Sequence, residues 1–590
     1  MIYDLNDEQK NIIATDENLI VSACPGSGKT RVLTCKIGHC LDHLKSCKKY
    51  VVALTFTNRA ADEIHDRIEN LNIFADQLWV GTIHSFCLDW ILKPYSGYCP
   101  RTRNGFTVID EYTKESILNT FKDKYNVSIY TQINTRLNRN GSLAIQPTQK
   151  IKMIIEEYNK VLLDSKLIDF DLILYISFFL LCEYNNIPLI LSKLFSIICI
   201  DEYQDTQDLQ YAILTKIVKA GKGETKVMFV GDPDQAIYDS LGGEAKSISQ
   251  ITKETGNLRF EKLPLSGNYR SSQRIINFYR NFQLNNIPIT ALGKKSHENG
   301  LITLNKTIHK DDLAEEIARL IKISLSNGVP ANEICVIGPQ WYLITPLARK
   351  IKKLLPNIPL DAPGLSPLRK SKENIWFKIA RLFLTEPSPN LLCTRIRWAN
   401  EIIDQLSQEF GIPILEEYSK GRNLLRLINS ITFTENDGLE YLKRAFKSLM
   451  STLKITAKEN KELLNHWNSF FTSSKEMQLK DNIPSDIVSL KSMFNQSNGV
   501  VINTCHGTKG EEYETVIAFG ILHNYIPHSS QIDPNNPSLE VISSKKMLYV
   551  IGSRAKTNLH FISETGRLKN GNEMSINTQL NNVNFKYDCI

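Results

Sequence analysis

A glycine-rich loop between an apolar run and a helical pattern is the feature that most constrains the fold of this chain. Residues 19–23 read as a buried strand, and residues 31–41 have a helical pattern. A strand, a glycine-rich loop and a helix in this order bring backbone N–H groups and a helix N-terminus toward a phosphate group. The predicted loop comprises Ala23, Cys24, Pro25, Gly26, Ser27, Gly28, Lys29 and Thr30.

Two side chains of this loop match the needs of a bound nucleoside triphosphate. Lys29 is placed to reach the β- and γ-phosphates, and the hydroxyl of Thr30 is placed to bind Mg²⁺. The strict pattern begins with glycine, whereas Ala23 stands first here. A glycine-rich turn without a ligand is the alternative, and the strand–loop–helix context favours the nucleotide site.

Two adjacent carboxylates follow a second apolar strand. Residues 197–200 are Ile-Ile-Cys-Ile, and Asp201 and Glu202 come directly after them. Asp201 is predicted to hold the Mg²⁺, and Glu202 to orient and deprotonate the attacking water. The alternative is a solvated strand end with acidic side chains. With the loop at 23–30 upstream, the catalytic interpretation is favoured.

Three further side chains are candidates for sensing the γ-phosphate. Gln235 lies in a polar turn after an apolar strand, and Arg270 and Arg554 lie at the edges of apolar segments. Arginine suits this role because its guanidinium stays charged and binds phosphate oxygens bidentately. For either arginine alone, a surface ion pair is the alternative.

The order of strands and helices predicts an α/β protein with two cores, each interrupted by a helical insertion. Strands are expected at 19–23, 51–56, 79–83, 196–200 and 226–230, and in a second set at 301–304, 334–337, 499–504, 515–519 and 559–562. The expected domains are core 1 at 1–92 and 188–265, its insertion at 93–187, core 2 at 266–371 and 499–590, and its insertion at 372–498.

Composition excludes several classes of protein. With 42% hydrophobic and 23% charged residues the chain is typical of globular proteins, and 70 basic against 63 acidic residues leave only a mild positive charge. The longest apolar run, 172–182, is shorter than the roughly 20 residues of a membrane span. Twelve scattered cysteines without paired spacing favour reduced thiols. A cytoplasmic protein without a membrane partner is expected.

Ten segments, in this order, resemble the UvrD/Rep/PcrA group of superfamily 1 helicases. They are residues 5–9, 23–30, 54–64, 80–86, 167–171, 201–206, 231–238, 268–271, 504–513 and 548–555. The resemblance implies two RecA-like cores with ATP and Mg²⁺ in the cleft between them. It implies that Gln9, Arg31 and Tyr269 contact the adenine, that Glu512 contacts the ribose, and that Arg270 and Arg554 reach the γ-phosphate.

The resemblance also implies movement along single-stranded DNA, or along a duplex with a single-stranded tail, in the 3′→5′ direction. Phe56 matches a base-stacking position, and a stacked base contributes about 1–3 kcal/mol. The other residues on segments that line the strand are Thr55, Asn58, His84, Ser85, Thr504 and His506. Capping hydroxyls and hydrogen-bonded histidines are the alternatives for these residues.

The chain departs from the family at residues 239–242, where Asp-Ser-Leu-Gly replaces an aromatic residue and an arginine. Ser543 and Ser544 also replace an acidic pair. Short, divergent members of the group include the helicase-like subunit of the Gabija anti-phage system, which works beside an OLD-family nuclease with a TOPRIM domain. A regulatory ATPase subunit of such a nuclease, with weak unwinding, is therefore a second hypothesis. A nucleotide-binding protein without a nucleic-acid role is the third.

Overall fold

A computed structural model describes residues 5–589, with gaps at 45, 72, 74, 130, 239–241, 244, 363, 366–367, 369–373, 389–390, 457–459, 482, 484, 495–498 and 533–535. The side chains of 58, 59, 480, 481, 492 and 530 are also outside the description. The described chain forms two units. Unit 1 comprises Met1–Phe106, Gln132–Gln340 and Asn503–Ile590, and unit 2 comprises Thr107–Thr131 and Trp341–Ile502.

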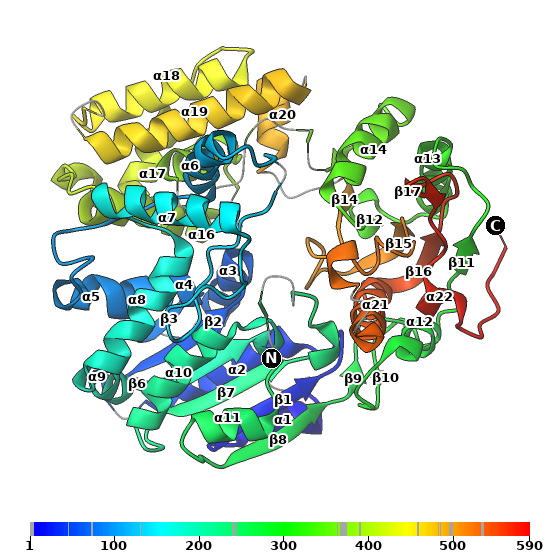
Figure 1. The fold of residues 1–590 in the computed structure, drawn as a ribbon, viewed down its shortest axis with the longest axis horizontal. Helices are drawn as coiled ribbons and strands as arrows, with labels where there is room; N and C mark the ends of the chain where they lie inside the picture. Colours follow the sequence, from blue (N-terminus) through cyan, green and yellow to red (C-terminus); the bar gives the residue numbers. More distant parts are fainter. Residues whose placement is uncertain are drawn as a thin grey trace. The chain divides into compact units, whose positions relative to one another are not determined.

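The first sheet of unit 1 has six parallel strands in the order β3-β2-β6-β7-β1-β8 (Figure 1). Its central strands are almost wholly buried and rich in branched apolar residues, as expected for a parallel sheet covered on both faces. The strands are β1 (Asn18–Ala23), β2 (Tyr50–Thr55), β3 (Leu78–Thr82), β6 (Phe195–Asp201), β7 (Lys226–Gly231) and β8 (Phe260–Leu265).

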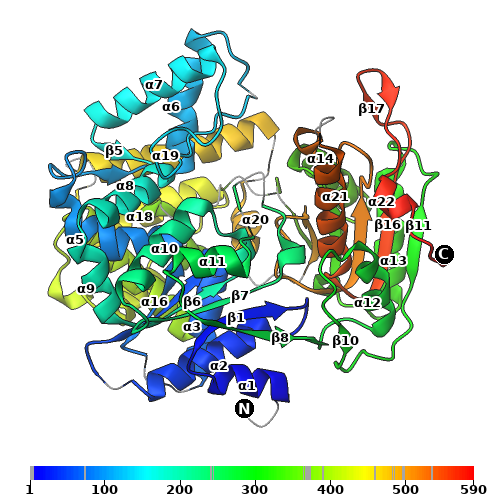
Figure 2. The same cartoon turned by 60° about the horizontal axis from the view of Figure 1, so that its bottom comes forward.

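Helices cover both faces of the first sheet (Figure 2). On one face α1, α2 and α3 pack together, and their apolar side chains Ile12, Val32, Ile37 and Ile64 join the core of the sheet. On the other face α10 packs with α8, α9 and α11. The bounds are α1 (Asp7–Ala14), α2 (Lys29–Asp42), α3 (Asn58–Asn70), α8 (Phe170–Glu183), α9 (Asn186–Leu194), α10 (Asp208–Ala220) and α11 (Ile248–Glu254).

The second sheet has the order β11-β16-β15-β12-β14-β13. The pairs β11–β16, β16–β15, β15–β12 and β14–β13 are parallel. The strands are β11 (Ile302–Asn305), β12 (Ile334–Gly338), β13 (Leu360–Asp361), β14 (Val500–Thr504), β15 (Tyr513–Phe519) and β16 (Ala555–Ile562). Helices of unit 1 that follow or precede these strands are α12 (Gln273–Tyr279), α13 (Leu313–Ser326), α21 (Pro537–Gly552) and α22 (Thr578–Asn581).

The other helices and strands of unit 1 include α7 and several short elements. They are α4 (Ile83–Phe86), a π-helix at Cys87–Leu92, α5 (Lys93–Tyr95), α7 (Gln149–Asp164), β5 (Leu167–Ile168), β9 (Gly267–Asn268), β10 (Thr290–Ala291), and the antiparallel pair β17 (Leu568–Lys569) and β18 (Asn572–Glu573).

Unit 2 is helical and has its own apolar core. Trp376, Phe446 and Trp467 pack at its centre, with ring centroids 4.8–6.1 Å apart. Asp110, which caps α6, accepts a hydrogen bond from Ser469 at 3.1 Å. The elements are β4 (Thr107–Val108), α6 (Glu111–Lys124), α14 (Trp341–Leu354), α15 (Ile375–Leu384), α16 (Leu392–Asp404), α17 (Gly421–Ser430), α18 (Gly438–Thr452), α19 (Lys461–Asp481) and α20 (Ile487–Ser492).

The prediction of two α/β cores is confirmed, and each of the ten predicted strands is present. The structure groups residues 107–131 with residues 341–502, whereas the sequence placed them in the insertion at 93–187. The boundaries of the four predicted segments stay a prediction. Of the strands in the two six-stranded sheets, β8 and β13 were not predicted, and neither were the short strands of the two-stranded sheets. β8 reads Phe-Glu-Lys-Leu-Pro-Leu and lacks an apolar run, and its Pro264 is tolerated because β8 is an edge strand.

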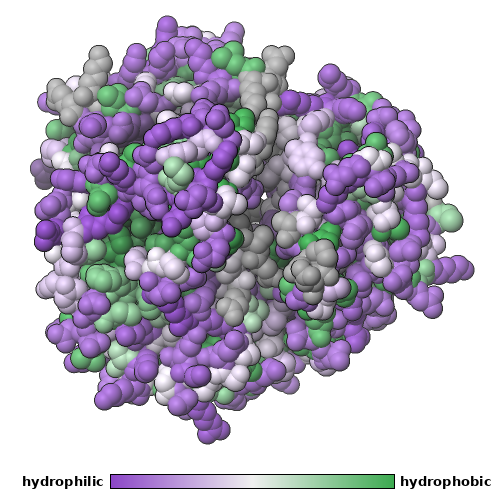
Figure 3. All heavy atoms as spheres, viewed as in Figure 1, coloured by the Kyte–Doolittle hydropathy of each residue, from purple (hydrophilic) through white to green (hydrophobic). Residues whose placement is uncertain are grey.

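The face drawn in Figure 3 is mostly hydrophilic, with hydrophobic residues scattered in small groups. Within the described ranges no single helix is long and apolar enough to cross a membrane. The pair α8 and α9, bent by 103° at its break, passes the same test by length and composition only.

Candidate active site

The phosphate-binding loop lies at the carboxyl end of β1, where parallel strands of an α/β sheet bind ligands. Gly26 and Gly28 adopt left-handed backbone conformations, with φ of 67° and 78°. Gly28 is the N-cap of α2 and has no side chain to cap the first turn, so the N–H groups of that turn are open to an anion. The hydroxyl of Ser27 is buried and has no hydrogen-bond partner among the described residues. The loop therefore fits a phosphate group.

Contacts from other segments fix the shape of this loop. Asn268 donates to the carbonyl of Pro25 at 2.7 Å, the backbone N–H of Tyr269 donates to Gly26 at 2.8 Å, and Gln9 donates to Ser27 at 3.1 Å. The backbone carbonyls of three successive loop residues, Pro25, Gly26 and Ser27, thus accept hydrogen bonds from residues outside the loop. A Cβ atom at Gly26 would lie 2.6 Å from Cβ of Arg270, so this position requires glycine.

The two predicted carboxylates meet the loop. Asp201 ends β6, and Glu202 follows in a left-handed conformation with φ of 51°, which turns its side chain toward Lys29. Glu202 Oε1 lies 3.5 Å from Lys29 Nζ, and Gln204 donates to the other oxygen, Oε2, at 2.5 Å. The carboxylate of Glu202 is therefore held in one orientation by an ammonium and an amide.

Burial and charge separate the acidities of this pair. Burial, and then the charge of Glu202, raise the pKa of Asp201. Burial also opposes ionisation of Glu202, but Lys29, Lys509 and the hydrogen bond from Gln204 outweigh it and lower the pKa of Glu202. A buried carboxyl whose ionisation is unfavourable is stabilised by a cation. The hydroxyl of Thr30 makes no hydrogen bond to a described residue. Asp201 and Thr30 thus fit a bound Mg²⁺.

Gln235 and Arg554 connect the two six-stranded sheets. Gln235 follows β7 and Arg554 precedes β16, yet Arg554 Nη2 donates to Gln235 Oε1 at 2.7 Å. Arg554 is 1% exposed and also donates to the carbonyls of Val550 and Glu511, both at 3.1 Å. Burial and the neighbouring charge of Arg270 lower the pKa of Arg554 to about 10, so the guanidinium remains charged at pH 7.

Lys509 makes a second connection between the sheets. Its Nζ lies 2.5 Å from Asp205 Oδ2 and 2.6 Å from the carbonyl oxygen of Gln235. Both side chains of the pair are buried, with 8% and 1% exposed. Burial raises the pKa of Asp205 to about 6, although Lys509 acts in the opposite direction. The other oxygen of Asp205, Oδ1, is buried and has no partner in the part of the chain that the structure describes.

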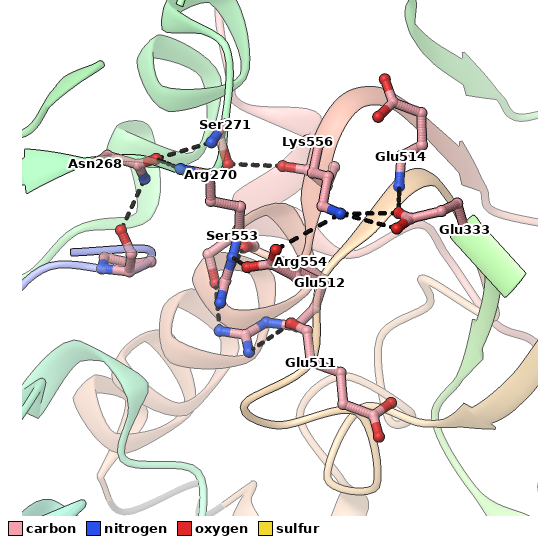
Figure 4. A network of polar contacts seen from close by, with 12 residues as sticks. Asn268, Arg270, Ser271, Glu333, Glu511, Glu512, Glu514, Ser553, Arg554 and Lys556 are labelled. Carbon is pink, nitrogen blue, oxygen red and sulfur yellow. Dashed lines mark hydrogen bonds and ion pairs between the residues drawn. The ribbon is translucent and has the colours of Figure 1, made fainter. Parts of the chain in front are cut away.

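Arg270 belongs to a network of charges beside Arg554 (Figure 4). Its Nε donates to Glu512 at 2.8 Å and its Nη1 donates to the carbonyl of Ser553 at 2.9 Å. Glu512 also lies 3.5 Å from Lys556, which pairs with Glu333 at 2.9 Å. Burial alone would raise the pKa of Glu512, but Arg270 and Lys556 lower it. No described residue bonds to Arg270 Nη2, so this nitrogen can meet a further anion.

The residues predicted to contact the adenine gather at the other side of the loop. Tyr269 is 40% exposed, and its hydroxyl accepts a hydrogen bond from Asn6 at 2.9 Å. Asn6 caps α1 together with Gln9 in a reciprocal capping box. The amide oxygen of Gln9 accepts from Asn6, and its nitrogen donates to Ser27. Arg31 lies in the first turn of α2. The exposed ring of Tyr269 provides a surface for stacking.

Of the residues predicted to line a nucleic-acid strand, Phe56 and His506 come together through Tyr238. The rings of Phe56 and Tyr238 are 4.6 Å apart, and those of Tyr238 and His506 are 5.3 Å apart. Phe56 is 38% exposed. His506 Nε2 lies 3.1 Å from the carbonyl oxygen of Ile237, so this nitrogen carries a proton. These three rings form an aromatic row, Phe56–Tyr238–His506, that joins the two sheets.

The remaining predicted strand contacts serve their own loops in this structure. Thr55 donates to the carbonyl of Thr57 at 2.9 Å, Ser85 lies 3.0 Å from the hydroxyl of Thr82, and the hydroxyl of Thr504 accepts from Gly507. His84 packs edge-on against Phe170, and burial lowers its pKa to about 4. The side chain of Asn58 lies outside the described residues, as do residues 239–241.

Sequence reasoning gave no role to Lys509, Asp205, Gln204 or Tyr238, although each lies in a segment that carries the family resemblance. Gln204 links Glu202 to the next strand end, because its oxygen accepts from the N–H of Asp232 at 3.0 Å. Their signal in the sequence is a polar residue three to seven positions after a strand end. Which partner each residue meets depends on the second core, and no local pattern carries that information.

The chain matches two family descriptions in succession. The UvrD/REP helicase N-terminal domain matches residues 5–256, and the UvrD-like helicase C-terminal domain matches residues 403–566. The chain belongs to the UvrD/Rep family of helicases. The resemblance, the two RecA-like cores and the expectation of a helicase-type enzyme are thus confirmed.

Two similar curated proteins span most of the chain. The ATP-dependent DNA helicase Rep of Buchnera aphidicola subsp. Acyrthosiphon pisum is 24% identical over 625 aligned positions, which cover 94% of this chain and 94% of that protein. The ATP-dependent DNA helicase PcrA of Staphylococcus aureus (strain COL) is 24% identical over 643 positions, which cover 98% of this chain and 85% of that protein.

Proposed function

We propose that the protein is an ATP-driven motor that moves 3′→5′ on single-stranded DNA and separates duplexes with a single-stranded tail. The observation that carries the proposal is the continuous chain of contacts from Lys29 and Glu202 to Gln235 and Arg554. This chain runs from the phosphate-binding loop on the first sheet to a buried arginine on the second. A change in the phosphate-binding loop on hydrolysis can therefore alter the contact between the two cores.

In this proposal the loop at 23–30 binds the β- and γ-phosphates of ATP, with Lys29 between them. Glu202 remains ionised because of its cationic neighbours, and so it orients the attacking water and accepts its proton. Thr30 and Asp201 hold the Mg²⁺, which when bound neutralises charge on the phosphates. Arg270 offers its unpaired Nη2 and Arg554 its fixed charge to the γ-phosphate.

Movement follows from a nucleotide-dependent equilibrium between two placements of the cores. Lys509 and Tyr238 tie the same two sheets as Arg554, and they lie next to the aromatic row. A change at Gln235 therefore reaches Phe56 through a short path. In this proposal Phe56 stacks on a base, and such stacking would bind single-stranded DNA without a preference for sequence.

The first experiment measures ATP hydrolysis by the purified chain with and without a single-stranded oligonucleotide. We expect strong stimulation by DNA, and loss of hydrolysis in Lys29→Ala and Glu202→Gln. Lys262→Ala, on the edge strand β8, removes an exposed lysine outside the loop and serves as the matched control. Normal hydrolysis by Lys29→Ala would refute the assignment of the site.

Direction is tested with two partial duplexes that carry either a 3′ or a 5′ single-stranded tail. The proposal expects ATP-dependent strand separation from the 3′ tail alone. Equal separation from both tails, or separation from the 5′ tail only, would contradict the stated polarity.

The second candidate is an ATPase subunit that regulates an OLD-family nuclease with a TOPRIM domain, as in the Gabija anti-phage system. It is favoured by the replacement of an aromatic residue and an arginine by Asp-Ser-Leu-Gly at 239–242. It expects DNA-stimulated hydrolysis with little unwinding, and co-purification with a nuclease encoded nearby. Robust unwinding by the isolated chain would exclude it.

A further inference from the structure

Ser266 lies where the chain crosses between the two cores. It is the single residue between β8, the edge strand of the first sheet, and β9, which pairs with β10 (Figure 1). β10 packs with α12, and α12 packs on β16 of the second sheet. The carbonyl of Ser266 accepts a hydrogen bond from the N–H of Thr290 at 3.1 Å. The position of Ser266 therefore affects how the second core follows the first.

Glu8, in the first turn of α1, binds Ser266 with both oxygens of its carboxylate. The N–H of Ser266 donates to Glu8 Oε2 at 2.8 Å, and the hydroxyl of Ser266 donates to Oε1 at 2.7 Å. A carboxylate accepts hydrogen bonds that are about twice as strong as those between neutral groups. α1 itself packs on α2 and β8. Ser266 is thus bound to the first core through its N–H and hydroxyl, and to β10 through its carbonyl.

The segment that follows the crossing carries a predicted contact to the base. The backbone N–H of Tyr269 donates to the carbonyl of Gly26 at 2.8 Å, and the hydroxyl of Tyr269 accepts from Asn6 at 2.9 Å. Asn6 caps the turn of α1 that also carries Gln9. The first turn of α1 therefore holds Gln9 and contacts both ends of the segment 266–269.

The two residues predicted to contact the base on either side, Gln9 and Tyr269, belong to different cores. We propose that Glu8 is a positioning residue for the nucleotide, because by holding Ser266 against α1 it sets how far the ring of Tyr269 lies from Gln9. This inference rests on the proposed function, since it requires ATP at the loop 23–30. Loss of Glu8 releases the segment that carries Tyr269, whereas the loop keeps its own contacts to the phosphates. By linkage, Glu8 also couples binding of the base to the placement of the second core.

The test compares ATP with inorganic tripolyphosphate, which has the same chain of phosphates and no base. Both ligands are titrated into the full-length protein with Mg²⁺ in a calorimeter. Glu8→Met keeps the length of the side chain and removes both acceptors. We expect this variant to bind ATP about tenfold more weakly, which corresponds to about one hydrogen bond to a charged group. We expect it to bind tripolyphosphate as the parent protein does.

Two further variants separate the contact from the charge. Asp7→Met makes the same substitution at the exposed neighbour in the same turn of α1, and it should bind ATP as the parent protein does. Glu8→Gln removes the charge, but its amide can accept from the N–H of Ser266 and donate to the hydroxyl oxygen, so it should recover most of the affinity. Glu8→Met should have a smaller effect in Ser266→Ala than in the parent protein, because the two residues form one contact.

Hydrolysis gives an independent measurement. The KM for ATP should rise about tenfold in Glu8→Met, with kcat at saturating ATP nearly unchanged, because Lys29 and Glu202 keep their places. A role in folding alone would instead lower kcat and weaken tripolyphosphate binding as well.

The possible results are distinct. Equal ATP affinities of Glu8→Met and Asp7→Met would overturn the inference. An equal loss of ATP and tripolyphosphate binding would also overturn it, because the effect would then lie at the phosphates. A parent protein that binds ATP no more tightly than tripolyphosphate would leave no base contact for Glu8 to position. A parent protein that binds neither ligand would refute the proposed function itself.

Discussion

Replacing Lys509 with methionine should destabilise unit 1 by an amount that grows with pH. Lys509 pairs with Asp205 at 2.5 Å, and both side chains are almost completely buried. Methionine keeps most of the apolar stem and removes the charge, so the carboxyl group of Asp205 loses its counter-ion. Glu202 and Lys29 are the other charged groups that act on Asp205, and the substitution leaves them in place.

The magnitude follows from the pKa of Asp205, which burial raises from its usual 3.8 to about 6. Because the folded-state pKa exceeds the unfolded value, the stability that this group contributes is complete below pH 4 and is lost as pH rises toward 6. Without Lys509 the folded-state pKa rises further, and the loss continues through pH 8. The parent protein gains RT ln(1 + 10^(pH − pKa)) over a variant whose carboxyl stays protonated. This gain is below about 1 kcal/mol at pH 6 and rises to about 3 kcal/mol at pH 8.

The assay is urea unfolding at pH 6, 7 and 8, followed by tryptophan fluorescence, with differences compared at the same transition. Asp205→Asn removes the titrating group, so the pH slope should vanish when Lys509→Met is introduced into Asp205→Asn. A difference between the parent and Lys509→Met that is constant from pH 6 to 8 would refute the reasoning. A slope that survives in the double variant would assign the titration to another group.

Three further outcomes are expected. Mg²⁺ affinity, measured by calorimetry in the presence of ATP, should increase as pH rises from 5.5 to 8. The pKa of Asp201 is raised, so its carboxyl group must lose a proton before the cation binds. An Mg²⁺ affinity that is constant over this pH range would contradict a role for Asp201 as ligand. Lys556→Met should raise the KM for ATP several-fold with kcat nearly unchanged, because Glu512 loses one of its two neighbouring cations. Lys556→Arg should restore the KM of the parent protein. A fall in kcat alone would argue against a positioning role for Lys556. Phe56→Ala should weaken single-stranded DNA binding about tenfold to a hundredfold, whereas Phe56→Tyr should not; equal affinities of both variants would remove Phe56 from the strand path.

Local sequence patterns were sufficient for most of the fold. The buried strands of both sheets are continuous apolar runs, and the structure places a strand at every one of them. β8 was missed because an exposed edge strand needs no apolar run. β16 begins at Ala555, four residues before its predicted start, because its first half alternates between buried and partly exposed positions. Residues 107–131 show a different limit, since a helix that packs on a distant insertion has the same amphipathic pattern as one that packs locally.

The site residues that follow strands of one sheet could be predicted from the sequence. The contacts between residues of different cores could not. The loop at 23–30 and the pair Asp201–Glu202 each follow a strand of the same sheet, so parallel topology alone brings them together. Asp205 and Lys509 are 304 residues apart, and only the packing of the second sheet pairs them. Arg554–Gln235 and Lys509–Asp205 both join the two sheets. If the protein works as the proposed motor, the strength of these two pairs should set how far a bound nucleotide shifts the equilibrium between the two placements of the cores.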